Sequence, residues 1–195
     1  MRWFLEQEVV GEAGFDDLVA LTQVKPVPAA AKLELACDYF GEMGRGNPSG
    51  MYGAMLGMPV DDLGLEPAIE TTVWESLALT NTMAAFATTR RYAWHSVGAL
   101  GVIELTAPGC SAKTAAGPRR LGLSDRRRRD CDLHAVLDIK HSEDWNREVL
   151  RPLIVALPEV ARFVAEGALT RLHGGARCFE RSRAHLWHGA RAAAA

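Results

Sequence analysis

The chain has 195 residues, of which 48% are hydrophobic and 24% are charged, and its net charge is −2. This length and balance are typical of one globular domain with a sizeable core, so we expect a single domain over residues 1–195. The small net charge excludes a general attraction to nucleic acid or to membrane surfaces. No apolar run approaches the ~20 residues that span a bilayer, and the first residues lack the apolar region of a signal peptide. We therefore expect a cytoplasmic protein that binds neither nucleic acid nor membrane.

The pattern of apolar residues predicts helices throughout, with no alternating strand pattern. The first helix has a weak point around Gly11 and Gly14. In chain order, the predicted helical segments are 3–23, 29–43, 69–106 as one central helix or two collinear ones, a short helix within 110–124, 125–149, and 159–188 with an interruption near Gly174 and Gly175. A short apolar segment, 51–58, lies between the second and third of these. Breaks are expected at the prolines 26, 28, 108, 152 and 158. The predicted fold class is an all-α bundle of about six to eight helices.

The four cysteines, at positions 37, 110, 131 and 178, are all far apart in the sequence. No two of them form a C-x-x-C pair, which excludes the common zinc-ribbon and redox spacings. Reduced thiols in a cytosolic protein are the expected state.

Carboxylates recur every four residues in the segment 29–43, at Glu34, Asp38 and Glu42. Three ionised carboxylates in one row repel each other unless something pairs with them. Two interpretations stay open: the row is a solvent-facing acidic surface, or at least one of its members turns inward toward a cation.

The long apolar segment 69–106 is expected to bury three polar residues, namely Asn81, His95 and Glu104. Glu104 follows an uncharged run, and a carboxylate in that position is costly unless it is paired. It is therefore either exposed at a helix end or bound to something. For His95, the favoured interpretation is an ordinary polar group with satisfied hydrogen bonds.

The segment 125–149 carries His134, Asp138 and His141 at positions i, i+4 and i+7, which lie on one face of a helix. Two imidazoles and a carboxylate on one face are able to bind a transition metal, and the carboxylate shifts the preference toward iron or manganese. The alternative is a solvated polar face. An apolar stripe beside the three residues favours a position at the edge of the core; it consists of Leu133, Val136 and Leu137.

Candidate ligands thus come from three helices, and helical bundles build carboxylate-rich dimetal sites in this way. The chain resembles the heme-oxygenase-like diiron oxidases, also called iron-containing redox enzymes. The resemblance covers nearly the whole chain. It rests on Lys32–Ala36 with Gly41–Gly46, on Ala99–Glu104, on His134-x-x-x-Asp138-x-x-His141, and on Glu166–Arg171 with Trp187. The H-x-x-x-D-x-x-H element with a Glu 30 residues before it is the most specific part.

The resemblance implies a heme-oxygenase-like bundle that holds two irons and no heme. It carries over Glu42, Glu104, His134, Asp138 and His141 as metal ligands. The first histidine of the chain is His95, which agrees with the absence of a heme ligand in the N-terminal helix. Ferrous loading, O2 as cosubstrate and an external electron donor are implied. The resemblance also implies the oxidation of a small nitrogen-containing metabolite, by N-oxygenation or by C–H or C–C chemistry. A homodimer is a candidate assembly.

The chain departs from the family pattern at Tyr52, because the family has a histidine ligand about ten residues after the glutamate at position 42. A tyrosinate is a good ligand for ferric iron and a poorer one for ferrous iron. Gly41 also stands where an acidic residue is common, and the chain begins inside the expected first helix. The alternative hypothesis is therefore a metal-poor relative, either a mono-iron enzyme or a non-catalytic binding protein. A third hypothesis, a thiol hydrolase with Cys131 as nucleophile, lacks a neighbour that would activate the thiol.

Overall fold

The computed structural model describes residues 2–12, 14–23, 27–120 and 124–192. Within these ranges the side chains of 118, 126, 127, 129–131 and 188–192 are not described. The described residues form helices joined by short turns and include no β-strand, so the all-α prediction is confirmed.

The N-terminal part folds as three helices, α1 (Arg2–Glu12), α2 (Phe15–Gln23) and α3 (Ala29–Glu42). The predicted weak point of the first helix is confirmed, because α1 ends at Glu12 and α2 begins at Phe15. After α3 come two short 3-10 turns, η1 (Gly44–Gly46) and η2 (Pro48–Gly50), and then α4 (Tyr52–Asp62). This arrangement places the acidic row of α3 one short turn away from Tyr52.

The long apolar segment divides at Thr89, whose backbone is extended, into α5 (Trp74–Thr88) and α6 (Ala93–Arg120). The predicted helix end at Pro108 is wrong, because α6 continues through it for three more turns. Proline has no N–H, so the carbonyl of Glu104, four residues earlier, lacks its helical donor. An interior proline costs about 3 kcal/mol, and the extensive contacts of α6 with α7 and α9 outweigh it.

Residues 125–156 form one continuous helical segment: α7 (Asp125–Asp144), the π-helical turn η5 (Trp145–Leu150) and α8 (Arg151–Ala156). The predicted break at Pro152 is wrong, whereas Leu157 and Pro158 do end the helix. A π-turn changes the hydrogen-bond register of the backbone. This one ends at Leu150, two residues before Pro152, which has no N–H to donate. The changed register allows the chain to remain helical across Pro152.

The C-terminal helix α9 (Ala161–Ala192) runs without the interruption predicted near Gly174 and Gly175. A Cβ atom at Gly174 would lie 2.7 Å from Cδ1 of Leu79, so the glycine permits close contact with α5. This packing compensates for the low helix propensity of glycine, about 1 kcal/mol relative to alanine. Of the helices described, none, α9 included, is both long and apolar enough to cross a membrane.

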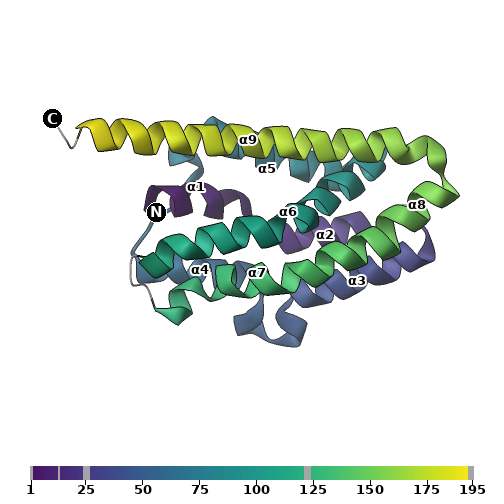
Figure 1. Cartoon of the computed structure of the whole chain (residues 1–195), viewed down its shortest axis with the longest axis horizontal. Helices are drawn as coiled ribbons and strands as arrows, with labels where there is room; N and C mark the ends of the chain where they lie inside the picture. Colours follow the sequence, from purple (N-terminus) through teal and green to yellow (C-terminus); the bar gives the residue numbers. More distant parts are fainter. Residues whose placement is uncertain (1, 13, 24–26, 121–123, 193–195) are drawn as a thin grey trace.

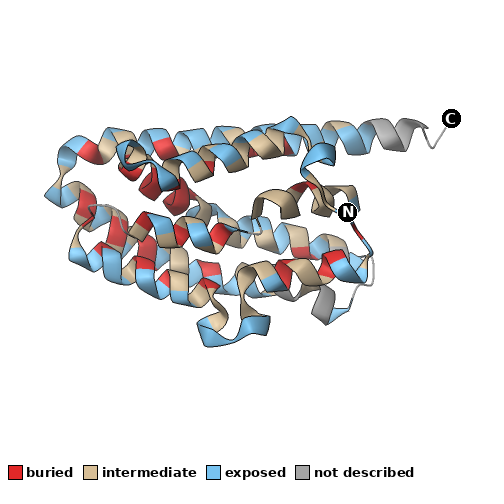
Figure 2. Cartoon of the chain, turned by 180° about the vertical axis from the view of Figure 1, so that it is seen from behind, coloured by how far each residue is buried: buried red, intermediate tan, exposed pale blue. Residues whose placement is uncertain are grey.

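Figure 1 shows α6 in the middle of the bundle, with α9 along one side and α7 along the other. Buried residues gather on the helix sides that face each other (Figure 2). The core includes Phe15, Val19, Leu35, Met83, Val97, Leu100, Trp145, Val149, Leu153 and Val164. Gly101 lets Trp145 pack directly on α6, since a Cβ atom there would lie 2.4 Å from the indole Nε1. This contact holds the middle of α6, which includes Glu104, against the start of η5 in the core.

We expect Gly98→Ala to destabilise the protein by roughly 2–3 kcal/mol, because overpacking a tight helix crossing forces the helices apart. A Cβ atom at Gly98 would lie 1.9 Å from the backbone oxygen of Val164 in α9. Gly109→Ala, in the same helix, is the matched control, since nothing lies within 4 Å of its Cβ position. Urea unfolding measures both. Equal stability of the two variants would contradict the close α6–α9 crossing.

Candidate metal centre

The structure brings His134, Asp138 and His141 to the inner side of α7, as their spacing predicts. Asp138 is 3% exposed and lies between the two imidazoles. Its Oδ1 is 3.0 Å from Nδ1 of His134 and 3.6 Å from Nδ1 of His141. A single carboxylate thus contacts both histidines. His141 also lies near Asp38 and Glu104, whereas His134 shares a cavity with Glu12 and Glu42.

Glu104 faces the same place from the centre of α6. It is 4% exposed, which excludes the alternative of a solvent-facing helix end. Its Oε2 lies 3.8 Å from Nδ1 of His141. The carboxylate after the uncharged run is therefore paired inside the protein.

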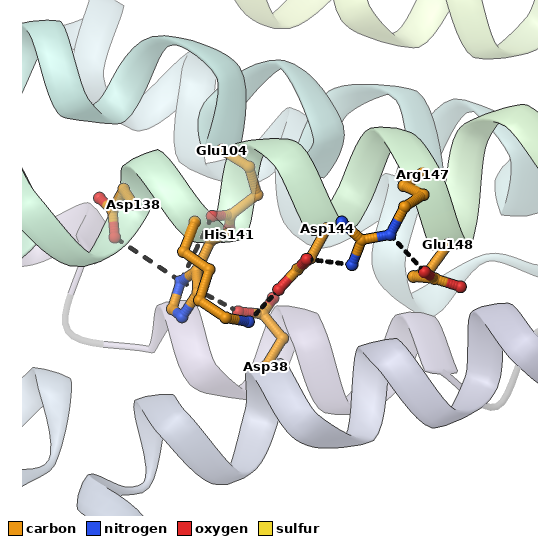
Figure 3. Close-up of polar contacts among 8 residues, drawn as sticks. Asp38, Glu104, Asp138, His141, Asp144, Arg147 and Glu148 are labelled. Atoms are coloured by element: carbon orange, nitrogen blue, oxygen red, sulfur yellow. Dashed lines mark hydrogen bonds and ion pairs between the residues drawn. The ribbon is translucent and has the colours of Figure 1, made fainter.

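Asp38 of α3 completes this group and is absent from the ligand set predicted from the sequence. It is 5% exposed, and its Oδ1 lies 3.5 Å from Nδ1 of His141. Neither of its carboxylate oxygens accepts a hydrogen bond from the described residues. Asp38, Glu104 and His141 each present one ligand atom within 4.8 Å of the others, and Figure 3 shows them converging. We call these three residues the Asp38 cluster.

A second group surrounds His134 and lines a cavity of about 90 Å³ next to the Asp38 cluster. We call it the Tyr52 cluster; it consists of Glu12, Glu42, Tyr52 and His134. The Tyr52 hydroxyl donates a hydrogen bond to Oε2 of Glu12 at 3.4 Å, and the Tyr52 and His134 rings meet edge to face at 5.3 Å. Asp138 also lines this cavity, so it lies between the two clusters.

Sequence reasoning did not find Glu12, although it found the other members of the Tyr52 cluster. Glu12 is the last residue of α1, and its partner at helical spacing within that helix is Glu8, which does not line this cavity. It reaches the cavity because α1 packs against α4, which begins at Tyr52. No signal local to Glu12 in the sequence indicates this contact.

The electrostatics of the Asp38 cluster indicate a missing positive charge. Burial, with the nearby charges of Glu34 and Asp138, raises the pKa of Asp38 from its ordinary value of 3.8 to about 7. Burial and neighbouring carboxylates also raise the pKa of Glu104 well above its usual value. Burial lowers the pKa of His141, although Asp138 opposes this shift. Several buried carboxylates therefore share a region in which burial disfavours a proton on His141.

These residues fit a divalent transition metal. A buried carboxylate without donors is costly, and a cation compensates for the cost. The ion pairs of Asp38, Glu104 and Asp138 within the described part of the chain are with His134 and His141 alone. Mixed imidazole and carboxylate ligands suit iron and manganese. The Asp38 cluster therefore offers mixed imidazole and carboxylate ligands of the kind that such an ion binds.

The remaining polar residues singled out in the sequence lie outside this centre. Nε2 of His95 lies 3.2 Å from Oε2 of Glu166, as the ordinary interpretation predicts, whereas its buried Nδ1 has no hydrogen-bond partner among the described residues. Asn81 is exposed, so its predicted burial is wrong; the solvent side of α5 carries it. Four consecutive arginines occupy positions 126–129, and the described side chain among them, that of Arg128, pairs with Asp125 and Asp132. The side chain of Cys131 lies outside the described part, and the thiol-hydrolase hypothesis stays untested.

The comparison with known protein families agrees with the geometry. A family model described as iron-containing redox enzyme matches residues 2–176, which include every residue of both clusters. No significant match to a curated protein was found. The predicted resemblance is confirmed, and with it an iron-dependent redox role. The chain belongs to the family of iron-containing redox enzymes.

Proposed function

We propose that the protein is a non-heme diiron oxidase or oxygenase. One iron would bind Asp38, Glu104 and His141, and the other would bind Glu12, Glu42 and His134, with Tyr52 as a further ligand. Asp138 would contact both sites. The observation that carries this proposal is the Asp38 cluster, in which the buried oxygens of Asp38 accept no hydrogen bond from the described residues, next to the cavity lined by Glu12, Glu42, Tyr52 and His134.

Two ferrous ions bound here would supply electrons to O2 and so provide an oxidant for a substrate. The residues of the chain have three tasks. The two clusters hold the ions at fixed positions on packed helices. Phe15, Ile103 and Ala107 form the apolar part of the cavity wall, which would limit the access of water to the ions. The hydrogen bond from Tyr52 to Glu12 places one proton at the cavity wall. An external donor would return the electrons.

We propose a small nitrogen-containing metabolite as the substrate, oxidised at nitrogen or at a C–H or C–C bond. The cavity of about 90 Å³ supports a small substrate. This chemistry comes from the family resemblance, and it rests on the diiron proposal.

The test is O2 consumption by protein loaded anaerobically with ferrous iron. We expect rapid uptake by the native protein and loss of at least 90% of the rate in His141→Ala. His95→Ala is the matched control, because it removes an imidazole that packs among aromatic rings outside the metal centre. Equal rates in all three proteins would overturn the proposal.

The second candidate function is a mono-iron enzyme, which the position of Tyr52 favours. If Tyr52 is a ferric ligand, the oxidised iron protein will show a visible tyrosinate-to-iron charge-transfer band, and Tyr52→Phe will abolish it. Tyr52→His is expected to improve loading of the second iron, because imidazole is the better ferrous ligand. A colourless ferric protein would show that Tyr52 does not bind iron. Unchanged iron content in Tyr52→His would show that this position does not limit loading.

A further inference from the structure

The turn between α3 and α4 has an unusual backbone. Gly44, Arg45 and Gly46 have φ angles of 62°, 52° and 83°. Among the described residues, Arg45 is the one non-glycine residue with a positive φ. This conformation is unfavourable for a side chain with a Cβ atom, and such residues cluster at functional sites. An arginine at this position is therefore a candidate functional residue.

Contacts around the turn hold Arg45 in this conformation. A Cβ atom at Gly44 would lie 2.5 Å from the carbonyl carbon of Gly50, so the two ends of the turn pack backbone to backbone. An isolated antiparallel bridge joins Met43 to Met51. The side chain of Asn47 accepts a hydrogen bond from the backbone N–H of Ser49 at 3.1 Å. The turn is thus closed by contacts between its two ends, and these contacts fix the backbone of Arg45.

Arg45 lies beside the candidate metal centre. Arg45 lines a cavity of about 50 Å³ together with four candidate ligands, Glu42, Tyr52, His134 and His141. Apolar side chains form the rest of the wall, namely Met55, Leu133 and Leu137. Arg45 itself is exposed, whereas Glu42 is buried, so the cavity leads from a cation at the surface to ligands inside. Within the described residues, Arg45 forms no ion pair.

We propose that Arg45 anchors the carboxylate of a small substrate whose other end lies at the candidate ligands. An unpaired guanidinium binds a carboxylate through two parallel hydrogen bonds, and the rigid turn lowers the cost of ordering it. The apolar wall suits the carbon chain that joins the two ends. The oxidation of this substrate rests on the proposed function, but the binding of the carboxylate does not.

The test measures binding of butyrate to the full-length, metal-free protein by NMR titration, with butanol and butylamine as probes of equal length. Arg45→Asn removes the charge while asparagine tolerates a positive φ. Arg45→Lys keeps a cation but loses the bidentate geometry. Lys140→Gln is the matched control, because it removes an exposed cation of α7 that pairs with Asp144 and does not line the cavity. Circular dichroism verifies that each variant is folded.

We expect Arg45→Asn to weaken butyrate binding at least tenfold, Arg45→Lys to weaken it less, and Lys140→Gln to leave it within twofold. Butanol and butylamine should bind at least tenfold more weakly than butyrate. Equal butyrate binding in native protein and Arg45→Asn, or equal binding of butanol and butyrate, would overturn the proposal. Binding that appears only after iron is added and ignores Arg45 would also overturn it and leave the iron site standing. Arg45-dependent binding in a protein that takes up no iron would support the anchor and reject the diiron function.

Discussion

Asp38→Asn is expected to abolish iron binding at the Asp38 cluster and, at the same time, to stabilise the metal-free protein. The carboxylate lies 5% exposed, and neither of its oxygens accepts a hydrogen bond from the described residues. Burying this charge without donors is unfavourable, and a bound metal compensates for it. Without the metal, the charge lowers the free energy of unfolding. An amide of the same shape removes the charge and also a ligand for iron.

The size and sign of this effect follow from the pKa of Asp38, which is raised from 3.8 to about 7 in the folded protein. The unfolded chain loses the proton near pH 4 and the folded chain near pH 7. The free energy of unfolding therefore falls as pH rises between these values, by up to about 4 kcal/mol, and is level above pH 7. Asp38→Asn removes this part of the pH dependence.

Urea unfolding of chelator-treated protein at pH 5 and pH 8 measures the difference. We expect the native protein to lose stability between the two pH values, and Asp38→Asn to lose about 2–4 kcal/mol less. Asp61→Asn is the matched control, because Asp61 is an exposed carboxylate of α4. A native protein whose stability does not fall from pH 5 to pH 8 would show that Asp38 is not the buried, uncompensated acid described above.

The second large effect is the pH dependence of metal binding. A metal binds ionised carboxylates, and the pKa of Asp38, raised to about 7, means that a proton occupies this carboxylate near neutral pH. Burial and the neighbouring carboxylates shift the pKa of Glu104 in the same direction. Metal affinity is therefore full above these pKa values and is lost as pH falls. Below pH 7, Asp38 alone makes the Kd rise about tenfold per pH unit, and Glu104 adds to the slope.

Titration with Mn²⁺, which avoids oxidation during the measurement, checks this slope between pH 6 and pH 8. Calorimetry at pH 7 in two buffers of different ionisation enthalpy counts the protons released, and we expect about one or more per chain. Asp61→Asn should show the same slope as native protein. A Kd that is constant over this range, with no proton release, would contradict protonation of the Asp38 cluster.

The part of the site that could be predicted from the sequence is the part that local geometry determines. A helix places positions i, i+4 and i+7 on one face whatever surrounds it, so His134, Asp138 and His141 were predictable as a group. Glu104 was predictable as a paired or exposed carboxylate, because it follows an uncharged run. The choice between those two outcomes needed the structure, in which α6 packs between α7 and α9.

The candidate ligands that were not predicted, Asp38 and Glu12, depend on how helices face each other. Glu34, Asp38 and Glu42 have the same spacing, and only the orientation of α3 decides which are inside. Asp38 and Glu42 are buried, whereas Glu34 is half-buried. Glu12 depends entirely on the contact between α1 and α4.

The wrongly predicted helix ends have a related cause. Pro108, Pro152 and Gly174 weaken a helix locally by up to about 3 kcal/mol. Packing of α6 on its neighbours, the π-turn before Pro152 and the contact of Gly174 with Leu79 outweigh these costs. Energies of this kind come from residues distant in the sequence, so local composition does not reveal them.

The most direct measurement is the number of irons bound per chain after anaerobic loading with ferrous iron and removal of the excess. The diiron proposal predicts about two irons in native protein and in His95→Ala, and no more than one in His141→Ala and Asp38→Asn. One iron in the native protein would mean that the Tyr52 cluster does not hold a second ion. No bound iron, or full loading of the His141→Ala and Asp38→Asn variants, would contradict the metal centre itself.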